Sequence, residues 1–136
     1  YYNKKRELKR ALKFHFKLSH LWVGNGNYVH NFQEQIDKVL FEIKKRNGYN
    51  SKVFLQHRKA IKNSGSRYSK LKKIKNPTLI IHGSDDPLIK LSHAKKMASL
   101  IHGCKFETIL GMGHDFHKNF KNRINSIILS HILRNC

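Results

Sequence analysis

Two short segments carry residues whose types and spacing suit acid–base chemistry. The first, residues 80–87 (IIHGSDDP), is an apolar run that ends in a glycine turn and presents Asp86. The second, residues 111–114 (GMGH), places two glycines around a turn that presents His114, 28 residues after Asp86. A carboxylate and an imidazole displayed at strand ends have the chemistry of the last two members of a nucleophile–histidine–acid triad.

The third member of such a triad is not found in a recognisable motif. No Ser or Cys among the 136 residues lies in a Gly-x-Ser/Cys-x-Gly elbow. Ester hydrolysis needs an activated hydroxyl, a base that takes its proton, and donors for the oxyanion. The sequence therefore predicts the back half of a hydrolase, which we expect to be inactive alone.

The same residues also have non-catalytic interpretations. Asp86 could cap the turn before Pro87, and His114 could simply occupy a turn. We expect Asp85 to be a solvated turn residue, and it becomes the triad acid only if the register slips by one. Asp115 is expected to tie the loop after His114 through backbone N–H groups.

The remaining nine histidines are scattered, and none forms an i, i+4 pair in a metal-binding motif. His82 lies in a predicted strand and is expected to be a packed core histidine. We expect surface or helix positions for the others that fall near the motifs, namely His93, His102, His117 and His131. The sequence therefore predicts neither a metal site nor another cofactor.

Alternating strands and helices position the two motifs. The pattern predicts a buried strand at residues 78–82, a helix at 92–102 with Ser92 as N-cap, a strand at 105–110 and a helix at 119–134. Short loops between these elements favour a right-handed parallel unit, whose strand ends form one edge where α/β proteins build their sites. Because two strands alone do not make a stable sheet, we expect a neighbouring sheet.

The preceding residues are predicted to be helical. Apolar side chains recur at helical spacing over residues 7–22, 31–46 and 51–62. Residues 69–76 form a basic connector that Leu71 and Ile74 are expected to anchor. Aromatic residues of this part could line an acyl pocket, although helix packing is favoured for them; they are Phe14, Phe16, Trp22 and Tyr28.

The formal charge of +20 is unevenly distributed. Residues 1–76 hold 20 basic against 4 acidic residues, a surplus of 16, whereas residues 77–136 hold 8 against 4, a surplus of 4. Such a surface could bind nucleic acid or anionic lipid. However, Lys, Asn and Ile total 46 residues, a bias typical of AT-rich genomes, and the basic residues are dispersed. We favour the compositional explanation, so nucleic acid is not the expected partner.

The two cysteines and the lengths of the apolar runs indicate the expected cellular location. Cys104 and Cys136 have no zinc-type spacing, and the chain does not open with a secretion signal, which favours a reducing compartment, the cytoplasm. No apolar run approaches the ~20 residues of a membrane span. The start at Tyr1 is compatible with a fragment or a processed chain.

From residue 47 to about 132, the sequence resembles the C-terminal part of α/β-hydrolase fold enzymes, and most of all the aclacinomycin methylesterase-like esterases. The similar segments are residues 47–49 (NGY), 77–83 (PTLIIHG), 85–88 (DDPL) and 111–115 (GMGHD). The resemblance implies an α/β fold class, a partial α/β-hydrolase fold. In it residues 1–70 are a helical cap, and residues 71–136 are a core segment with the last two parallel strands of the sheet.

The resemblance also implies a function. It assigns Asp86 as the triad acid and His114 as the general base of a carboxylic-ester hydrolase with a Ser-His-Asp mechanism and a small-molecule ester substrate. In this family the nucleophile elbow and the oxyanion loop precede the cap, so both would lie upstream of Tyr1 and a complementary N-terminal half is the expected partner. Where the family often has Pro after its His-Asp pair, this chain has Phe116 and His117.

Two other hypotheses do not require catalysis. The basic half could belong to a non-catalytic module that binds polyanions, with an affinity that falls steeply with salt. Alternatively, the chain could be a remnant that pairs its open sheet edge with another protein. The identity of the ester is left open, because it depends on cap contacts and on the missing half.

Overall fold

The computed structural model describes residues 2–24, 31–46 and 51–136. The segment at 47–49 and the pocket interpretation of Tyr28 lie outside the described residues. The chain divides into two compact units, each described below by itself. The first unit holds the described parts of residues 1–20 and 29–66, and the second holds those of residues 21–28 together with residues 67–136.

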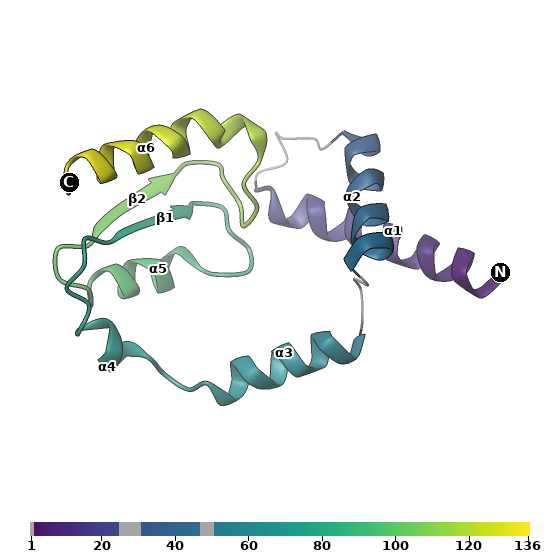
Figure 1. Cartoon of the computed structure of the whole chain (residues 1–136), viewed down its shortest axis with the longest axis horizontal. Helices are drawn as coiled ribbons and strands as arrows, with labels where there is room; N and C mark the ends of the chain where they lie inside the picture. The colour runs from purple at the N-terminus through teal and green to yellow at the C-terminus, as the bar shows by residue number, and fades with distance from the viewer. Residues whose placement is uncertain (1, 25–30, 47–50) are drawn as a thin grey trace. The chain divides into compact units, whose positions relative to one another are not determined.

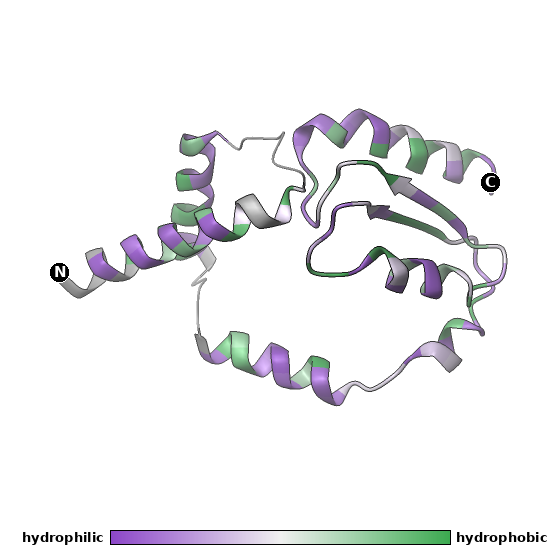
Figure 2. Ribbon diagram, turned by 180° about the vertical axis from the view of Figure 1, so that it is seen from behind, coloured by the Kyte–Doolittle hydropathy of each residue, from purple (hydrophilic) through white to green (hydrophobic). Residues whose placement is uncertain are grey.

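Three helices, seen in Figure 1, form the first unit: α1 (Tyr2–Trp22, whose last residues belong to the second unit), α2 (Phe32–Arg46) and α3 (Ser51–Asn63). Polar and apolar residues alternate along α1 (Figure 2). Asn31 begins α2, because its side-chain oxygen accepts the Gln33 N–H at 2.8 Å. Helix α1 starts five residues earlier than predicted, whereas α2 and α3 match their predicted ranges closely.

Side chains of α1 and α2 pack against each other inside this unit. Val39 is fully buried, and Gln35 is bound by His15 through an Nε2–Oε1 distance of 2.7 Å. The rings of Phe16 and Phe32 stack with centroids 4.7 Å apart. For Phe16, this contact matches the helix-packing interpretation, whereas Phe14 is largely exposed.

The second unit contains a parallel pair of strands between two helices. Strand β1 (Leu79–Gly83) pairs with β2 (Lys105–Ile109) in parallel, from Leu79 opposite Lys105 to Gly83 opposite Ile109. Helices α5 (Leu91–Ala98) and α6 (Lys121–Leu133) lie on opposite sides of this sheet (Figure 1). The predicted strand–helix–strand–helix order is therefore confirmed.

The core of the second unit lies between the sheet and α6. It is built from Ile109, Met112, Phe120 and Ile124, with Ile81 and Ile127 packed against it. Because both β strands run in the same direction, Gly83 and Ile109 end at the same edge of the sheet. The loops that carry the two motifs therefore begin side by side.

Three local details differ from the sequence prediction. Helix α5 begins at Leu91, so Ser92 lies inside it and Lys90 is the N-cap, without a side-chain hydrogen bond. The reason is burial, because Leu91 and Ala94 share the inner side of the helix. After Ala98 the chain continues as tight turns to the buried Ile101. The predicted basic connector contains a short helix, α4 (Tyr68–Leu71).

Among the described helices, none combines the length and the apolarity that crossing a bilayer requires. The 3₁₀ turn η1 (Lys118–Phe120) leads directly into α6 and completes the second unit.

Candidate active site

Backbone hydrogen bonds join the loops that follow β1 and β2. The Ser84 N–H donates to the Ile109 carbonyl at 3.0 Å, and the Asp85 N–H donates to the Met112 carbonyl at 3.0 Å. Gly83 permits this approach, because a Cβ atom there would lie 2.1 Å from the Met112 carbonyl oxygen. The glycine that ends the apolar run in the sequence therefore brings the two site loops into contact.

A side-chain relay reinforces the same junction. The Gly111 N–H donates to Ser84 Oγ at 2.8 Å, and the Ser84 hydroxyl donates to Asp85 Oδ1. Asp85 lies in a turn, as expected, but it is partly buried and its carboxylate is bound to Ser84, so it is not a solvated residue. Its carboxylate holds the loops, whereas the next residue supplies the carboxylate that faces the histidine.

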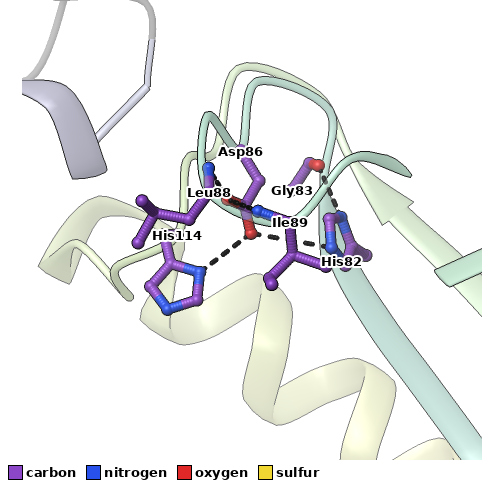
Figure 3. Close-up of polar contacts among 6 residues, drawn as sticks. All are labelled: His82, Gly83, Asp86, Leu88, Ile89 and His114. Atoms are coloured by element: carbon purple, nitrogen blue, oxygen red, sulfur yellow. Dashed lines mark hydrogen bonds and ion pairs between the residues drawn. The ribbon is translucent and has the colours of Figure 1, made fainter. Parts of the chain in front are cut away.

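Asp86 uses both of its carboxylate oxygens (Figure 3). Oδ1 accepts the backbone N–H groups of Leu88 at 2.8 Å and Ile89 at 2.9 Å, and Oδ2 faces the ring of His114. The side chain of Asp86 is only 6% exposed. Asp86 does cap its turn, as the non-catalytic interpretation proposed, but that uses one oxygen and leaves the other for His114.

The electrostatics of this site favour an ionised acid. Burial by itself raises the pKa of Asp86, but its hydrogen bonds to two backbone N–H groups and to the His114 ring outweigh that effect. The pKa of Asp86 therefore lies below its ordinary value. At neutral pH the carboxylate is charged and can act only as a hydrogen-bond acceptor.

His114 meets this carboxylate through its Nδ1 atom, 3.0 Å from Asp86 Oδ2. Because the carboxylate only accepts, Nδ1 must carry the proton, and a neutral ring then leaves Nε2 with a lone pair. Nε2 lies on the side of the ring turned away from Asp86 (Figure 3). The His114 side chain is 41% exposed, so the ring is oriented by Asp86 and still partly open to solvent.

A second imidazole lies beside Asp86. His82 Nε2 is 3.6 Å from the same Oδ2 atom, and His82 Nδ1 lies 2.8 Å from the Gly83 carbonyl oxygen (Figure 3). The longer distance exceeds a hydrogen bond but falls within ion-pair range when His82 is protonated. The sequence analysis expected a packed core residue here. The available signal was the four-residue spacing from Asp86 across a glycine turn.

Other residues singled out from the sequence occupy varied positions. Asp115 is exposed, and its backbone N–H donates to the Trp22 carbonyl at 3.0 Å. His117 was expected near the surface, which is wrong: it is buried, and its Nδ1 accepts the Asn119 N–H, so it caps η1. The Trp22 ring lies beside His114, with ring centroids 6.2 Å apart and planes inclined by 65°.

Among the described residues, no group of three His, Cys, Asp or Glu side chains is arranged to hold a metal ion. A buried, ionised carboxylate and an exposed imidazole can accept a proton from a hydroxyl and hold the resulting charge.

No family model matches the sequence, but solved structures are similar to it. A serine hydrolase involved in carbazole degradation (CarC) is 17% identical with a TM-score of 0.74, and the match covers 89% of this chain and 46% of that one. A variant of the meta-cleavage product hydrolase CumD is 17% identical with a TM-score of 0.69, covering 90% of this chain and 46% of its own.

An esterase from Exiguobacterium antarcticum gives a similar result. It is 18% identical with a TM-score of 0.68, and the match covers 94% of this chain and 48% of the esterase. The chain thus spans about half the length of the structures that it matches. Together these similarities show that the chain has a partial α/β-hydrolase fold and corresponds to the C-terminal half of these proteins.

Proposed function

We propose that this chain is the cap and C-terminal portion of a carboxylic-ester hydrolase in which His114 is the general base and Asp86 is the triad acid. The observation that carries this proposal is the 3.0 Å contact between His114 Nδ1 and Asp86 Oδ2 at the carboxyl edge of a parallel sheet. Structural similarity to an esterase and to a serine hydrolase supports the reaction class. The resemblance of residues 77–88 and 111–115 favours the aclacinomycin methylesterase-like subgroup.

The proposed chemistry begins with proton transfer to His114. A serine hydroxyl gives its proton to Nε2 while its oxygen attacks the ester carbonyl carbon, which forms a tetrahedral oxyanion. Asp86 stabilises the imidazolium across the Nδ1–Oδ2 contact. The imidazolium then protonates the departing alkoxide as its bond to carbon breaks, which leaves the acyl group on the serine oxygen. A water molecule, deprotonated by the same nitrogen, attacks the acyl carbon, and the serine oxygen takes that proton back as its bond to carbon breaks and the acid is released.

The nucleophile and the oxyanion donors are proposed to come from a complementary N-terminal half. The 136 residues contain no elbow serine, and the sheet formed by the described residues consists of β1 and β2 alone. Within the described residues, each strand therefore has one edge with no strand beside it, and a further strand could pair there. We propose that the chain alone is inactive and that the small-molecule ester binds only in the assembled protein.

The proposed location is the cytoplasm. Cys104 and Cys136 are both free thiols. Thiols that remain unpaired are typical of reducing compartments.

An extended polypeptide tests the proposed function. The coding sequence upstream of Tyr1 would be read for a Gly-x-Ser-x-Gly motif, and the longer product would be assayed with a p-nitrophenyl acyl ester beside the 136-residue chain. We expect turnover only from the extended protein, with loss of that turnover in His114→Ala. If the 136-residue chain turns over the ester and His114→Ala abolishes that turnover, the proposed inactivity of the chain alone is contradicted. If turnover by the extended protein survives His114→Ala, the assignment of His114 as the base is contradicted.

A further inference from the structure

Residues at the end of α1 form a third part of the site, which the two motifs do not reveal. The Val23 carbonyl accepts the Gly113 N–H at 3.0 Å, and the Trp22 carbonyl accepts the Asp115 N–H at 3.0 Å. Gly24 and Met112 form an antiparallel bridge beside them. Residues 22–24 thus lie along the backbone on both sides of His114, like a short added strand.

The closeness of this contact depends on the sequence. A Cβ atom at Gly113 would lie 2.2 Å from the Trp22 carbonyl oxygen, so only glycine allows the two backbones to approach. Val23 and Met112, which flank the contact, are 1% and 2% exposed. The loop that holds His114 therefore follows β2 directly and is held on its other side by residues 22–24.

The Trp22 side chain extends this contact to the imidazole itself. Its ring lies edge-on to His114, with centroids 6.2 Å apart and planes inclined by 65°. The indole Nε1 atom is buried and has no hydrogen-bond partner among the described residues. The observed interaction of this side chain is therefore the contact of its ring with His114.

We infer that Trp22 is a positioning residue for His114: its ring forms a wall that keeps the imidazole turned toward Asp86. Asp86 fixes one atom of the ring, Nδ1, and a single hydrogen bond leaves the ring free to pivot about it. The aromatic contact removes that freedom. The catalytic meaning of this role rests on the proposed function, but the contact and its effect on the ring can be measured without any activity.

The fluorescence of Trp22 tests the contact directly, because this is the single tryptophan of the chain. A protonated imidazole in contact with indole quenches its emission, whereas a neutral imidazole quenches weakly. We expect the emission of the unsubstituted chain to rise in a single step as the pH is raised, and we expect His114→Gln to abolish this step. A missing step in the unsubstituted chain, or a step that persists in His114→Gln, would overturn the contact.

A matched pair of variants tests the positioning role. Trp22→Phe keeps an aromatic wall and removes the unpaired donor, whereas Trp22→Leu keeps apolar volume without a ring. The readout is the ring-nitrogen NMR spectrum of His114, with Asp86→Asn as the reference for a lost Nδ1–H contact. We expect the Phe variant to retain the unsubstituted signal and the Leu variant to shift toward the reference. Equal spectra for the two variants, whether both retained or both shifted, would contradict the inference.

Failure of this inference is distinguishable from failure of the proposed function. If the extended protein shows no esterase activity while the emission step and the Phe/Leu difference are present, Trp22 positions His114 for another purpose. If activity is present but the spectra of the two variants agree, Trp22 is only a packing residue.

Discussion

His114 Nδ1 lies 3.0 Å from Asp86 Oδ2, although the two residues are 28 positions apart in the chain. Each residue follows a strand of the same parallel pair. Hydrogen bonds of Ser84 and Asp85, which lie between β1 and Asp86, hold the two loops together. The contact is thus a product of the local fold. Both residues belong to the second unit.

Asp86→Asn tests the role of the acid. The amide can still accept backbone N–H groups, but its NH₂ group favours the wrong tautomer of His114, so we expect kcat of the extended protein to fall by about 10⁴-fold. Asp115→Asn is the matched control, because that carboxylate is exposed and adjacent to His114. Esterase kinetics would measure both. Similar losses in the two variants would show that charge near His114, and not the Asp86 contact, is what matters.

Acid unfolding tests the lowered pKa of Asp86. A carboxyl group whose pKa is lower in the folded state stabilises the fold at pH values above its unfolded pKa, about 3.9. That contribution disappears as the pH falls through the lower folded pKa. We expect the difference in unfolding free energy between the unsubstituted chain and Asp86→Asn to be largest above about pH 5 and to shrink toward pH 2. Urea titrations across this range would measure it, and a difference that grows in acid would be the opposite of our expectation.

Ser84→Ala tests the side-chain relay between the loops. The substitution removes the acceptor of the Gly111 N–H and the donor to Asp85. We expect a loss of about 1–3 kcal/mol in unfolding free energy, because a partly buried N–H is left without a partner. Hydrogen exchange of the Gly111 amide should accelerate. Ser99→Ala, which removes a bond on an exposed turn, serves as a control and should cost less; equal costs would argue against the relay.

Two substitutions separate the contacts of His82. In His82→Asn the amide can still donate to the Gly83 carbonyl, whereas in His82→Gln the longer side chain can still place an N–H near Asp86 Oδ2. We expect His82→Asn to lower the turnover of the extended protein more than His82→Gln does. Both variants should turn over the ester much faster than Asp86→Asn. The reverse order would mean that the Gly83 contact is the important one.

The contact between Asp86 and His114 and the two strands were predictable because their signals are local. A continuous apolar run defines a buried strand, and the glycines after it mark where the strand ends. Parallel strands then bring Asp86 and His114 to one edge without further information. The same reasoning predicted three helices in the first half, since their apolar residues recur at helical spacing.

What the sequence did not reveal depends on long-range packing. Nothing in the residues around Trp22 indicates that its carbonyl binds Asp115 or that its ring lies beside His114. His117 lies in a polar segment, and only the fold shows that it is buried as the cap of η1. The Ser92 cap was predicted from residue preference, but α5 begins one residue earlier, at Leu91, which is half-buried on the same side of the helix as the buried Ala94.

The most direct test of the acid–base pair is the NMR signal of the His114 Nδ1 proton in this 136-residue chain. The structure predicts a proton on Nδ1 of the neutral ring, shifted downfield by its hydrogen bond to a carboxylate and lost from that position in Asp86→Asn. A neutral His114 that carries its proton on Nε2, or a signal that Asp86→Asn leaves unchanged, would contradict the proposed pairing.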